Sequence, residues 1–407
     1  MQRQAAREFD LMSQAYKRDP RSTLRELRDG GDVVPVKFPL IGETKLVVSY
    51  AGVTELLKDS KRFVQRPKNA GVKQRIGIQW WMPRTVRVLG DSMIGQDDPE
   101  HRRLRGLVDK AFSRRGVEVL RGAIEEIADE LLDNMERQSR VDLVDDFARR
   151  LPLMVIAKLL GLPDEDNDRL QRWTKGLVNG TSVAALAMAM PRLLLMSWYL
   201  QRQIEQARKS PRPGLLSELI GVEADGDKLN DDELLAMVFL LFFAGHETTT
   251  HTLSVGTLTL LQNPEIRDRL ISAPEQWGSA VEEILRWCST VEFSKPRYVA
   301  EAGEFHGVML ERGQTIFAGI AAANYDPRAF DDANSFNIDR NPNPHLAFGS
   351  GVHFCLGHQL ARLELTIAFE RLFARFPNLN LAVPEDELRW KGNLGIRGLM
   401  RMPVNLR

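Results

Sequence analysis

Residues 348–357 read Phe348-Gly349-Ser350-Gly351-Val352-His353-Phe354-Cys355-Leu356-Gly357. An amphipathic pattern that predicts a helix follows, from Leu356 to Phe376. Two glycines before the cysteine permit a tight turn, and Gly357 removes a side chain where a flat ligand could approach. Because Cys355 immediately precedes the helix, the amides of its first turn favour thiolate over thiol. This segment therefore predicts a loop that presents sulfur to a metal in a large planar group.

A lone cysteine is more often a small buried apolar side chain than a metal ligand. Here, however, five loop positions together resemble the haem-binding signature of the cytochrome P450 family: Phe348, Gly351, His353, Cys355 and Gly357. In that family a cysteine thiolate is the proximal ligand of haem iron. The resemblance implies that Cys355 binds the iron of haem b and that Phe348, Gly349 and Gly357 lie against the cofactor.

A second pattern predicts a long helix over 231–262, with an irregular centre that reads Ala244-Gly245-His246-Glu247-Thr248-Thr249-Thr250. Glycine and consecutive threonines are poor residues for a helix middle. One use for them is a hydrogen bond from Thr248 to the carbonyl of Ala244, which would open a groove beside Gly245 for dioxygen and water. Taken alone, ordinary backward bonding by threonines and a solvent-facing Glu247 explain the pattern better.

This segment also resembles the acid–alcohol pair of the central P450 helix. The resemblance implies that Thr248 stabilises bound oxygen, that Glu247 helps to deliver protons, and that Ala244 and Gly245 lie beside the haem. A peroxide-using member of the family would be expected to lack the pair. We expect His246 to be structural.

Haem carries two propionates, which need cationic or hydrogen-bonding partners when buried. Four residues match the positions where the family places them: His101, Arg105, Arg297 and His353. For Arg105 and Arg297 the alternative is a solvated basic face.

Glu283 and Arg286 are three residues apart and share one face of a predicted helix. Such pairs are usually exposed and weak. In this context they resemble the Glu-x-x-Arg motif of the family, with Arg340 as the third member of a buried network that braces the cysteine loop. We expect this network to be structural.

Helical patterns dominate from residue 100 to about 285, whereas β-prone pieces occur near both ends. Val33–Leu40 and Thr44–Tyr50, joined at Gly42, predict a hairpin. This order favours a mainly α, α+β fold. The matched motifs extend over essentially the whole chain, so the resemblance implies one P450 domain over 1–407, with haem between the central helix and the cysteine-loop helix.

Lys and Arg total 55, as do Asp and Glu, so the chain of 407 residues has no net charge to attract nucleic acid. Its two cysteines exclude a disulfide framework and a four-cysteine iron–sulfur site. The first residues do not form a signal peptide or membrane anchor, and the longest apolar run, 234–244, is too short to span a bilayer. We therefore expect a cytoplasmic protein without a membrane anchor or a nucleic-acid partner.

The sequence contains no flavin or dinucleotide fingerprint. The electron donor must therefore be a separate protein, and our hypothesis is a small acidic ferredoxin or flavodoxin with its reductase, which would carry electrons from NAD(P)H. A basic docking patch on the cysteine side is one hypothesis, and scattered solvated cations explain the same residues equally well. The residues are Arg102, Arg103, Lys110, Arg114, Arg115 and Arg362.

The family resemblance places the substrate pocket in segments whose side chains are mostly apolar: Ile78, Trp80, Trp81, Met82, Leu240, Phe243, Ala244, Val291, Phe293, Leu394 and Ile396. Residues 183–200 are apolar enough to form an adaptable lid, although ordinary helix core is an equally good explanation. These features favour a hydrophobic small-molecule substrate, such as a terpenoid, steroid, fatty acid or polyketide. Nearby cations leave room for a carboxylate or an acidic carrier protein: Lys68, Lys73, Arg75, Arg84 and Arg87.

Together these features predict a haem-thiolate monooxygenase that inserts one atom of O2 into its substrate by hydroxylation or epoxidation. One alternative is a haem-thiolate binding or sensing protein without turnover, but such a protein would not need Glu247 and Thr248 for proton delivery. Another is a cysteine hydrolase with His353 or His358 as base, but no other segment supplies an orienting group.

Overall fold

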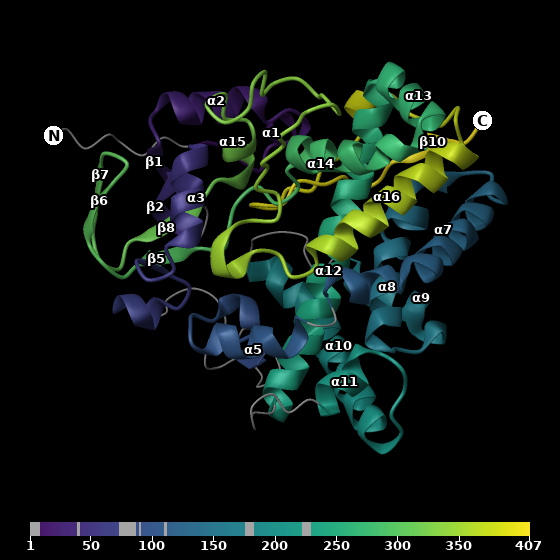
Figure 1. Cartoon of the computed structure of the whole chain (residues 1–407), viewed down its shortest axis with the longest axis horizontal. Coiled ribbons are helices and arrows are strands. Elements are labelled where there is room, and N and C mark those ends of the chain that lie inside the picture. The colour runs from purple at the N-terminus through teal and green to yellow at the C-terminus, as the bar shows by residue number, and fades with distance from the viewer. Residues whose placement is uncertain are drawn as a thin grey trace.

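The computed structural model describes residues 9–38, 41–72, 87–88, 91–109, 112–175, 183–221 and 229–407, and only the backbone of residues 114 and 183–187. Helices fill most of the molecule; most of the strands gather at the side that carries the N-terminus, and a strand close to the C-terminus lies on the opposite side (Figure 1). The helical part is held by one large apolar cluster, and two smaller clusters lie about the sheet. The prediction of a mainly α, α+β fold is confirmed.

The helices are α1 Gln14–Arg18, α2 Arg21–Asp29, α3 Tyr50–Lys58, α5 Glu100–Val108, α6 Arg114–Glu118, α7 Arg121–Glu136, α8 Arg150–Leu160, α9 Asn167–Thr174, α10 Val183–Lys209, α11 Leu215–Gly221, α12 Asp231–Gln262, α13 Pro264–Ser272, α14 Trp277–Cys288, α15 Ile320–Asn324 and α16 His358–Arg375. The strands are β1 Val33–Phe38, β2 Gly42–Val47, β3 Phe63–Val64, β4 Val141–Asp142, β5 Arg297–Val299, β6 Gly303–Phe305, β7 Val308–Leu310, β8 Thr315–Ala318, β9 Asn380–Leu381 and β10 Pro403–Asn405. Short 3-10 turns cover Pro67–Ala70, Met93–Gly95, Asp164–Asp166, Pro274–Gln276, Gly351–His353 and Glu385–Glu387, and Val144–Ala148 is π-helical.

The helix α12 has the bounds that its sequence pattern predicts. It begins with a capping box, in which the Asn230 side chain accepts from the Glu233 amide and the Glu233 carboxylate accepts from the Asn230 amide, each at 2.9 Å. It packs against α8, α10, α14 and α16. Gly256 permits close packing against α16, because a β-carbon there would lie 2.6 Å from Phe369 Cζ.

The predicted hairpin at the start of the chain is confirmed. The strands β1 and β2 pair antiparallel, with Val33 opposite Val47, in a sheet of order β1-β2-β8-β5-β3. The second strand ends three residues earlier than predicted, because the Ser49 hydroxyl accepts from the Gly52 amide at 3.1 Å and caps α3. The sheet is thereby joined directly to α3, whose C-terminal end contacts the cysteine loop.

The helix after the cysteine loop is also confirmed, as α16, although it begins at His358 and not immediately after Cys355. Among the described residues, no helix combines the length and the apolar character that crossing a membrane requires.

Candidate active site

Residues 348–357 form the tight turn that the sequence predicts. The Cys355 amide donates to the carbonyl of Phe348 at 2.9 Å, and the Phe354 amide donates to that of Gly351 at 3.0 Å. Gly349 and Gly351 have φ of +71° and +72°, values that L side chains rarely adopt. A β-carbon on Gly357 would meet only Phe112 Cε1, at 4.0 Å, so packing between protein groups does not explain this glycine.

Two arginines hold the turn from opposite sides. Arg105 Nη1 donates to the carbonyls of Phe354, at 2.7 Å, and Val352, at 3.2 Å. The Arg362 guanidinium lies 4.5 Å from the centre of the Phe348 ring, and its Nε is 2.6 Å from a carboxylate oxygen of Glu282. The loop is therefore fixed by groups from α5 and α16.

The electrostatics of Cys355 differ from the sequence expectation. Burial raises the pKa of the Cys355 thiol, while the Gly357 amide and the charges of Arg105 and Arg362 act in the opposite direction. The Gly357 amide acts in the direction expected from the sequence, but without a bound cation desolvation outweighs it. A metal cation bound at the sulfur would supply the missing positive charge.

Basic side chains gather next to this loop. The rings of His101 and His353 lie 4.1 Å apart, and burial together with the charges of His101, Arg297, Lys295 and Arg105 lowers the pKa of His353 to about 3. In the described part of the chain, His101 Nε2 and Arg297 Nε are buried and have no hydrogen-bond partner. Buried polar atoms are normally satisfied, so this cluster fits an anionic ligand such as the carboxylates of haem.

The centre of α12 carries a series of side-chain bonds to its own backbone. Thr248 Oγ1 donates to the carbonyl of Ala244 at 3.0 Å, as the sequence predicts. Thr250 and Thr252 donate in the same way to the carbonyls four residues before them, at 2.8 and 3.1 Å. Side-chain bonds of this kind compete with the backbone hydrogen bonds of the helix. They also give each threonine hydroxyl a partner, which explains why these residues are accommodated in the helix interior.

Ala244 and Gly245, both expected to lie against haem, face different surroundings. Ala244 is exposed although it lies in the middle of a largely buried helix, and Leu240 and Thr248 are partly exposed beside it at a spacing of four residues. These three residues form the open stripe of α12. Gly245 instead faces α8, where a β-carbon would lie 3.1 Å from the Ile156 side chain. The packing of two helices therefore accounts for Gly245.

The carboxylate of Glu247 is buried in an ion pair. Its Oε1 accepts from Lys391 Nζ at 2.7 Å and from His251 Nε2 at 3.0 Å. Burial by itself would raise the pKa of Glu247, but the His251 hydrogen bond and the Lys391 charge hold it far below its ordinary value. His246 Nδ1 donates to the Phe242 carbonyl at 2.7 Å, which gives this residue the structural place expected for it.

Sequence reasoning missed Lys391 and His251. His251 is one helical turn after Glu247, and this spacing is visible in the sequence. Lys391 is 144 residues away, and no local pattern points to it.

The network of Glu283, Arg286 and Arg340 is confirmed. Arg286 donates to both carboxylate oxygens of Glu283, at 2.7 and 2.8 Å, and both side chains are fully buried. Arg340 Nε donates to Glu283 at 3.2 Å. Arg286 also donates to the carbonyls of Asn324 and Ala333, so the network joins α14 to the segment that leads to the cysteine loop.

Part of the expected substrate wall lies together. Val291 and Ile396 form an antiparallel bridge, and the rings of Phe239 and Phe243 stack at 5.7 Å on α12. Along the expected lid, α10 buries Met196 but exposes Met188, Leu195 and Trp198. Of the predicted cations near the pocket, Lys68 and Arg87 are described and exposed. Seven pocket and cation predictions lie outside the described residues: Ile78, Trp80, Trp81, Met82, Lys73, Arg75 and Arg84.

Three of the six residues of the predicted docking patch have acidic neighbours. Arg102 pairs with Asp98 at 3.0 Å, Arg103 pairs with Glu100 and Glu233, and Arg362 pairs with Glu282. Arg115 is exposed, Lys110 lies outside the described residues, and the side chain of Arg114 is not described.

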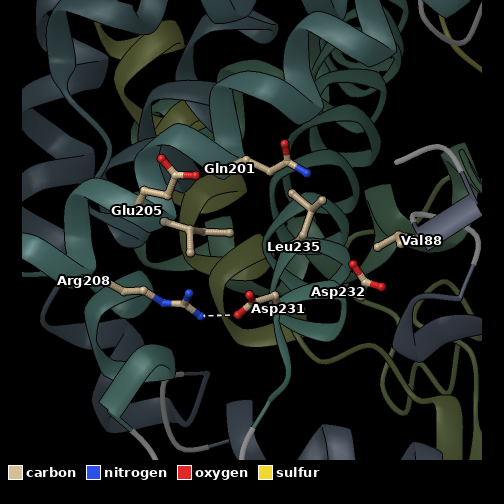
Figure 2. A pocket seen from close by; sticks show the side chains of 8 residues that line it. Val88, Gln201, Glu205, Arg208, Asp231, Asp232 and Leu235 are labelled. Carbon is tan, nitrogen blue, oxygen red and sulfur yellow. Dashed lines mark hydrogen bonds and ion pairs between the residues drawn. The ribbon is translucent and has the colours of Figure 1, made fainter. Parts of the chain in front are cut away.

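A separate cleft of about 310 Å³ lies between the C-terminal half of α10 and the start of α12 (Figure 2). Arg208 and Asp231 bond at 2.5 Å across it. Its lining is largely polar, unlike the apolar substrate wall: Val88, Gln201, Ile204, Glu205, Arg208, Asp231, Asp232 and Leu235.

Comparison with known proteins decides which family this geometry represents. The family model described as Cytochrome P450 matches residues 196–273 and 278–397. The chain is 39% identical over 401 residues, 98% of each chain, to the polyketide biosynthesis cytochrome P450 PksS of Bacillus subtilis (strain 168). This chain belongs to the cytochrome P450 family. The solved structure of the bacillaene polyketide synthase cytochrome P450 PksS has a TM-score of 0.89, with 38% identity, and covers 98% of this chain and 99% of its own.

A second similar P450 is the mycinamicin IV hydroxylase/epoxidase of Micromonospora griseorubida, 39% identical over 381 residues, which are 93% of this chain and 94% of that one. The present protein of 407 residues is a haem-thiolate monooxygenase that inserts one atom of O2 into a hydrophobic small molecule. It uses haem b, O2 and electrons derived from NAD(P)H through redox partners. The exposed face of Ala244, the unpartnered donors of His101 and Arg297, and the loop of Cys355 fit this cofactor.

Proposed function

We propose that Cys355 is the proximal ligand of haem iron and that His101, Arg297 and His353 bind the propionates. The observation that carries this proposal is the convergence of the cysteine turn with a cluster of buried basic side chains, in which His101 Nε2 and Arg297 Nε have no hydrogen-bond partner within the described chain. Arg105 fixes the turn from α5 and reaches the same cluster. Phe348, Gly349 and Gly357 would contact the porphyrin from the proximal side, and Ala244 from the distal side. We place Gly245 against α8 instead.

When bound, haem supplies the iron chemistry that transfers an oxygen atom to the substrate. Cys355 would hold the iron through its thiolate, a ligand that donates electron density. Thr248 keeps its hydroxyl on the open stripe of α12, where the oxygen can accept a hydrogen bond while its hydrogen is donated to the Ala244 carbonyl. Glu247, one residue before it, is the group that moves protons towards this stripe. The small side chain of Ala244 leaves room on the same face.

The proposed substrate is an apolar, polyketide-derived molecule. The two relatives carry names that refer to polyketide biosynthesis and to the hydroxylation or epoxidation of mycinamicin IV. The described wall residues Phe243, Val291, Phe293 and Ile396 offer apolar contacts and no charge. Macrolides and matched fatty acids should therefore be compared by the displacement of iron-bound water in the visible spectrum. Preferential displacement by fatty acids would contradict the polyketide assignment.

The ligand assignment is tested with two cysteine variants. Cys355→Ser should abolish the shifted absorbance band that carbon monoxide produces with the reduced protein. Cys288→Ser is the matched control, because Cys288 is buried on α14 with Thr259 Oγ1 at 3.9 Å and should leave the band unchanged. An unchanged band in Cys355→Ser, or a colourless wild-type protein after haem supplementation, would overturn the proposal.

We also propose that the electron donor is a small acidic ferredoxin or flavodoxin that docks on the side of the cysteine loop. Arg102 is 83% exposed, and Arg115 is exposed on α6. Charge reversal of both should slow reduction by such a donor at low salt, whereas charge reversal of the exposed Arg25 on α2 should not. Equal rates of reduction in the wild type, the double charge-reversal variant and the Arg25 variant would contradict this docking surface.

Finally, we propose that residues 1–407 fold as one domain. The large apolar cluster supports this, since it is one continuous core whose residues range from Met93 to Val404.

A further inference from the structure

Residues 389–400 form a narrow turn-back that we call the C-terminal hairpin. The Met400 amide donates to the carbonyl of Arg389 at 2.8 Å, and the Lys391 amide donates to that of Gly398 at 2.9 Å. At its tip, the Glu292 amide donates to the Gly395 carbonyl at 2.9 Å. The tip therefore belongs to the expected substrate wall, where Val291 and Ile396 pair.

The base of the C-terminal hairpin is locked against α12. Lys391 and Glu247 are only 6% and 7% exposed in their side chains and lie 2.7 Å apart. A β-carbon on Gly398 would lie 2.6 Å from His251 Cγ, so the opposite arm touches the imidazole ring with no space to spare. One short hairpin thus contacts the substrate wall at its tip and the acid of α12 at its base.

Several other charged or titratable groups face Glu247. His246 Nε2 is 3.9 Å from its second oxygen, and Arg149, which pairs with Asp145 at 3.3 Å, approaches from the start of α8. Burial and the Lys391 charge lower the pKa of His251 to about 4, so this ring is neutral near pH 7. Lys391 is therefore the cation in direct contact with the carboxylate.

We propose that Lys391 is a positioning residue that holds Glu247 ionised, and that the C-terminal hairpin transmits contact at the substrate wall to this ion pair. The inference rests on the proposed role of Glu247 in moving protons. A substrate that presses on Leu394 or Ile396 displaces the hairpin, lengthens the Lys391–Glu247 contact and lets the buried carboxylate accept a proton. Proton supply is thereby coupled to substrate occupancy.

The test is direct observation of the carboxyl group of Glu247 in the haem-loaded protein. The infrared C=O band of a protonated carboxyl is titrated against pH and assigned by its loss in Glu247→Gln. In Lys391→Met the band should appear at a pH about two units higher than in the wild type, because burial is no longer opposed by the cation. Lys391→Arg should restore the wild-type titration. Lys175→Met removes an exposed cation that binds Asp145 in the same region and should change nothing.

The coupling is tested by repeating the titration with a saturating apolar ligand selected by its spectral shift. The ligand should raise the midpoint in the wild type but not in Lys391→Met. An unchanged midpoint in Lys391→Met, or no ligand effect in the wild type, would overturn the inference. Lys391→Gln provides the same comparison if Lys391→Met does not fold. The carbon monoxide spectrum reports Cys355 independently, so a failure of the proposed haem site is recognised separately.

Discussion

The carbonyl oxygen of Leu57, at the end of α3, occupies the position that a β-carbon on Gly351 would need. Lys58 Cα would lie 2.9 Å from the same β-carbon. The N-terminal sheet region thus supports the cysteine loop through a backbone contact that only glycine permits.

Gly351→Ala should therefore weaken both the fold and haem retention. Gly349→Ala is the matched control, since its φ is nearly the same but a β-carbon there would meet nothing within 4 Å. We expect about 1–2 kcal/mol of destabilisation for the control, from the left-handed backbone alone, and a larger loss for Gly351→Ala. Denaturant unfolding of the haem-free proteins measures the difference, because Gly349 is itself one of the proposed haem contacts. Equal losses would show that the contact with α3 has no energetic role.

Replacement of Arg286 should be among the most damaging changes in α14. Arg286→Met leaves the fully buried carboxylate of Glu283 without its main partner, which costs about 3–5 kcal/mol. Arg371→Met, on the surface of α16, breaks a half-exposed pair with Asp129 and should cost about 1 kcal/mol or less. Thermal unfolding of the two variants gives the comparison. A loss in Arg286→Met as small as that in Arg371→Met would contradict the structural role of the network.

Gly245→Ala distinguishes helix packing from contact with the cofactor. The added methyl group would press on Ile156, so the variant should lose about 1–3 kcal/mol of stability. Adding Ile156→Val should recover part of that loss, because the two residues touch. If the second substitution recovers nothing while the haem spectrum changes, Gly245 acts on the cofactor side instead.

Stability should fall in acid through Glu282. Burial raises the pKa of this group, but hydrogen bonds from Arg362 and His345 prevail and lower it to about 2 from the ordinary 4.5. The unfolded chain therefore binds the proton first, so the stabilisation is complete above pH 4.5 and is lost as the pH falls towards 2.

After allowance for the partial solvent exposure of the pair, the lowered pKa of Glu282 contributes about 2 kcal/mol to the free energy of unfolding. Glu282→Gln should flatten this part of the stability–pH curve measured by urea unfolding. Glu165→Gln, at an exposed position, should leave the slope as it is. A slope in Glu282→Gln equal to that of the wild type would assign the acid sensitivity to other groups.

The local patterns were sufficient for the elements of the site. The hydrophobic periodicity predicted the bounds of α12, and the spacing of glycines predicted the turn before Cys355. The hydrogen bond from Thr248 to the carbonyl four residues before it was also predicted. Each of these features depends on residues within one or two turns of one another, so the sequence itself contains the determining interactions.

Packing between distant segments was not predictable in the same way. The sequence did not show that Ile156 of α8 lies against Gly245. The sequence likewise did not show how strongly burial raises the pKa of Cys355 against the effect of the Gly357 amide. Desolvation depends on everything that surrounds a group, and no local pattern contains that information.

By itself, the sequence determined the helical fold, the cysteine turn and the chemistry available on α12, because hydrophobic period, glycine placement and hydrogen-bonding side chains act locally. Only the tertiary structure decided that Lys391 meets Glu247, that Leu57 closes over Gly351 and that His101 lies on His353. These contacts join residues far apart in the chain. Burial of apolar surface brings them together, and because that driving force is non-directional, the sequence does not show which side chains will meet.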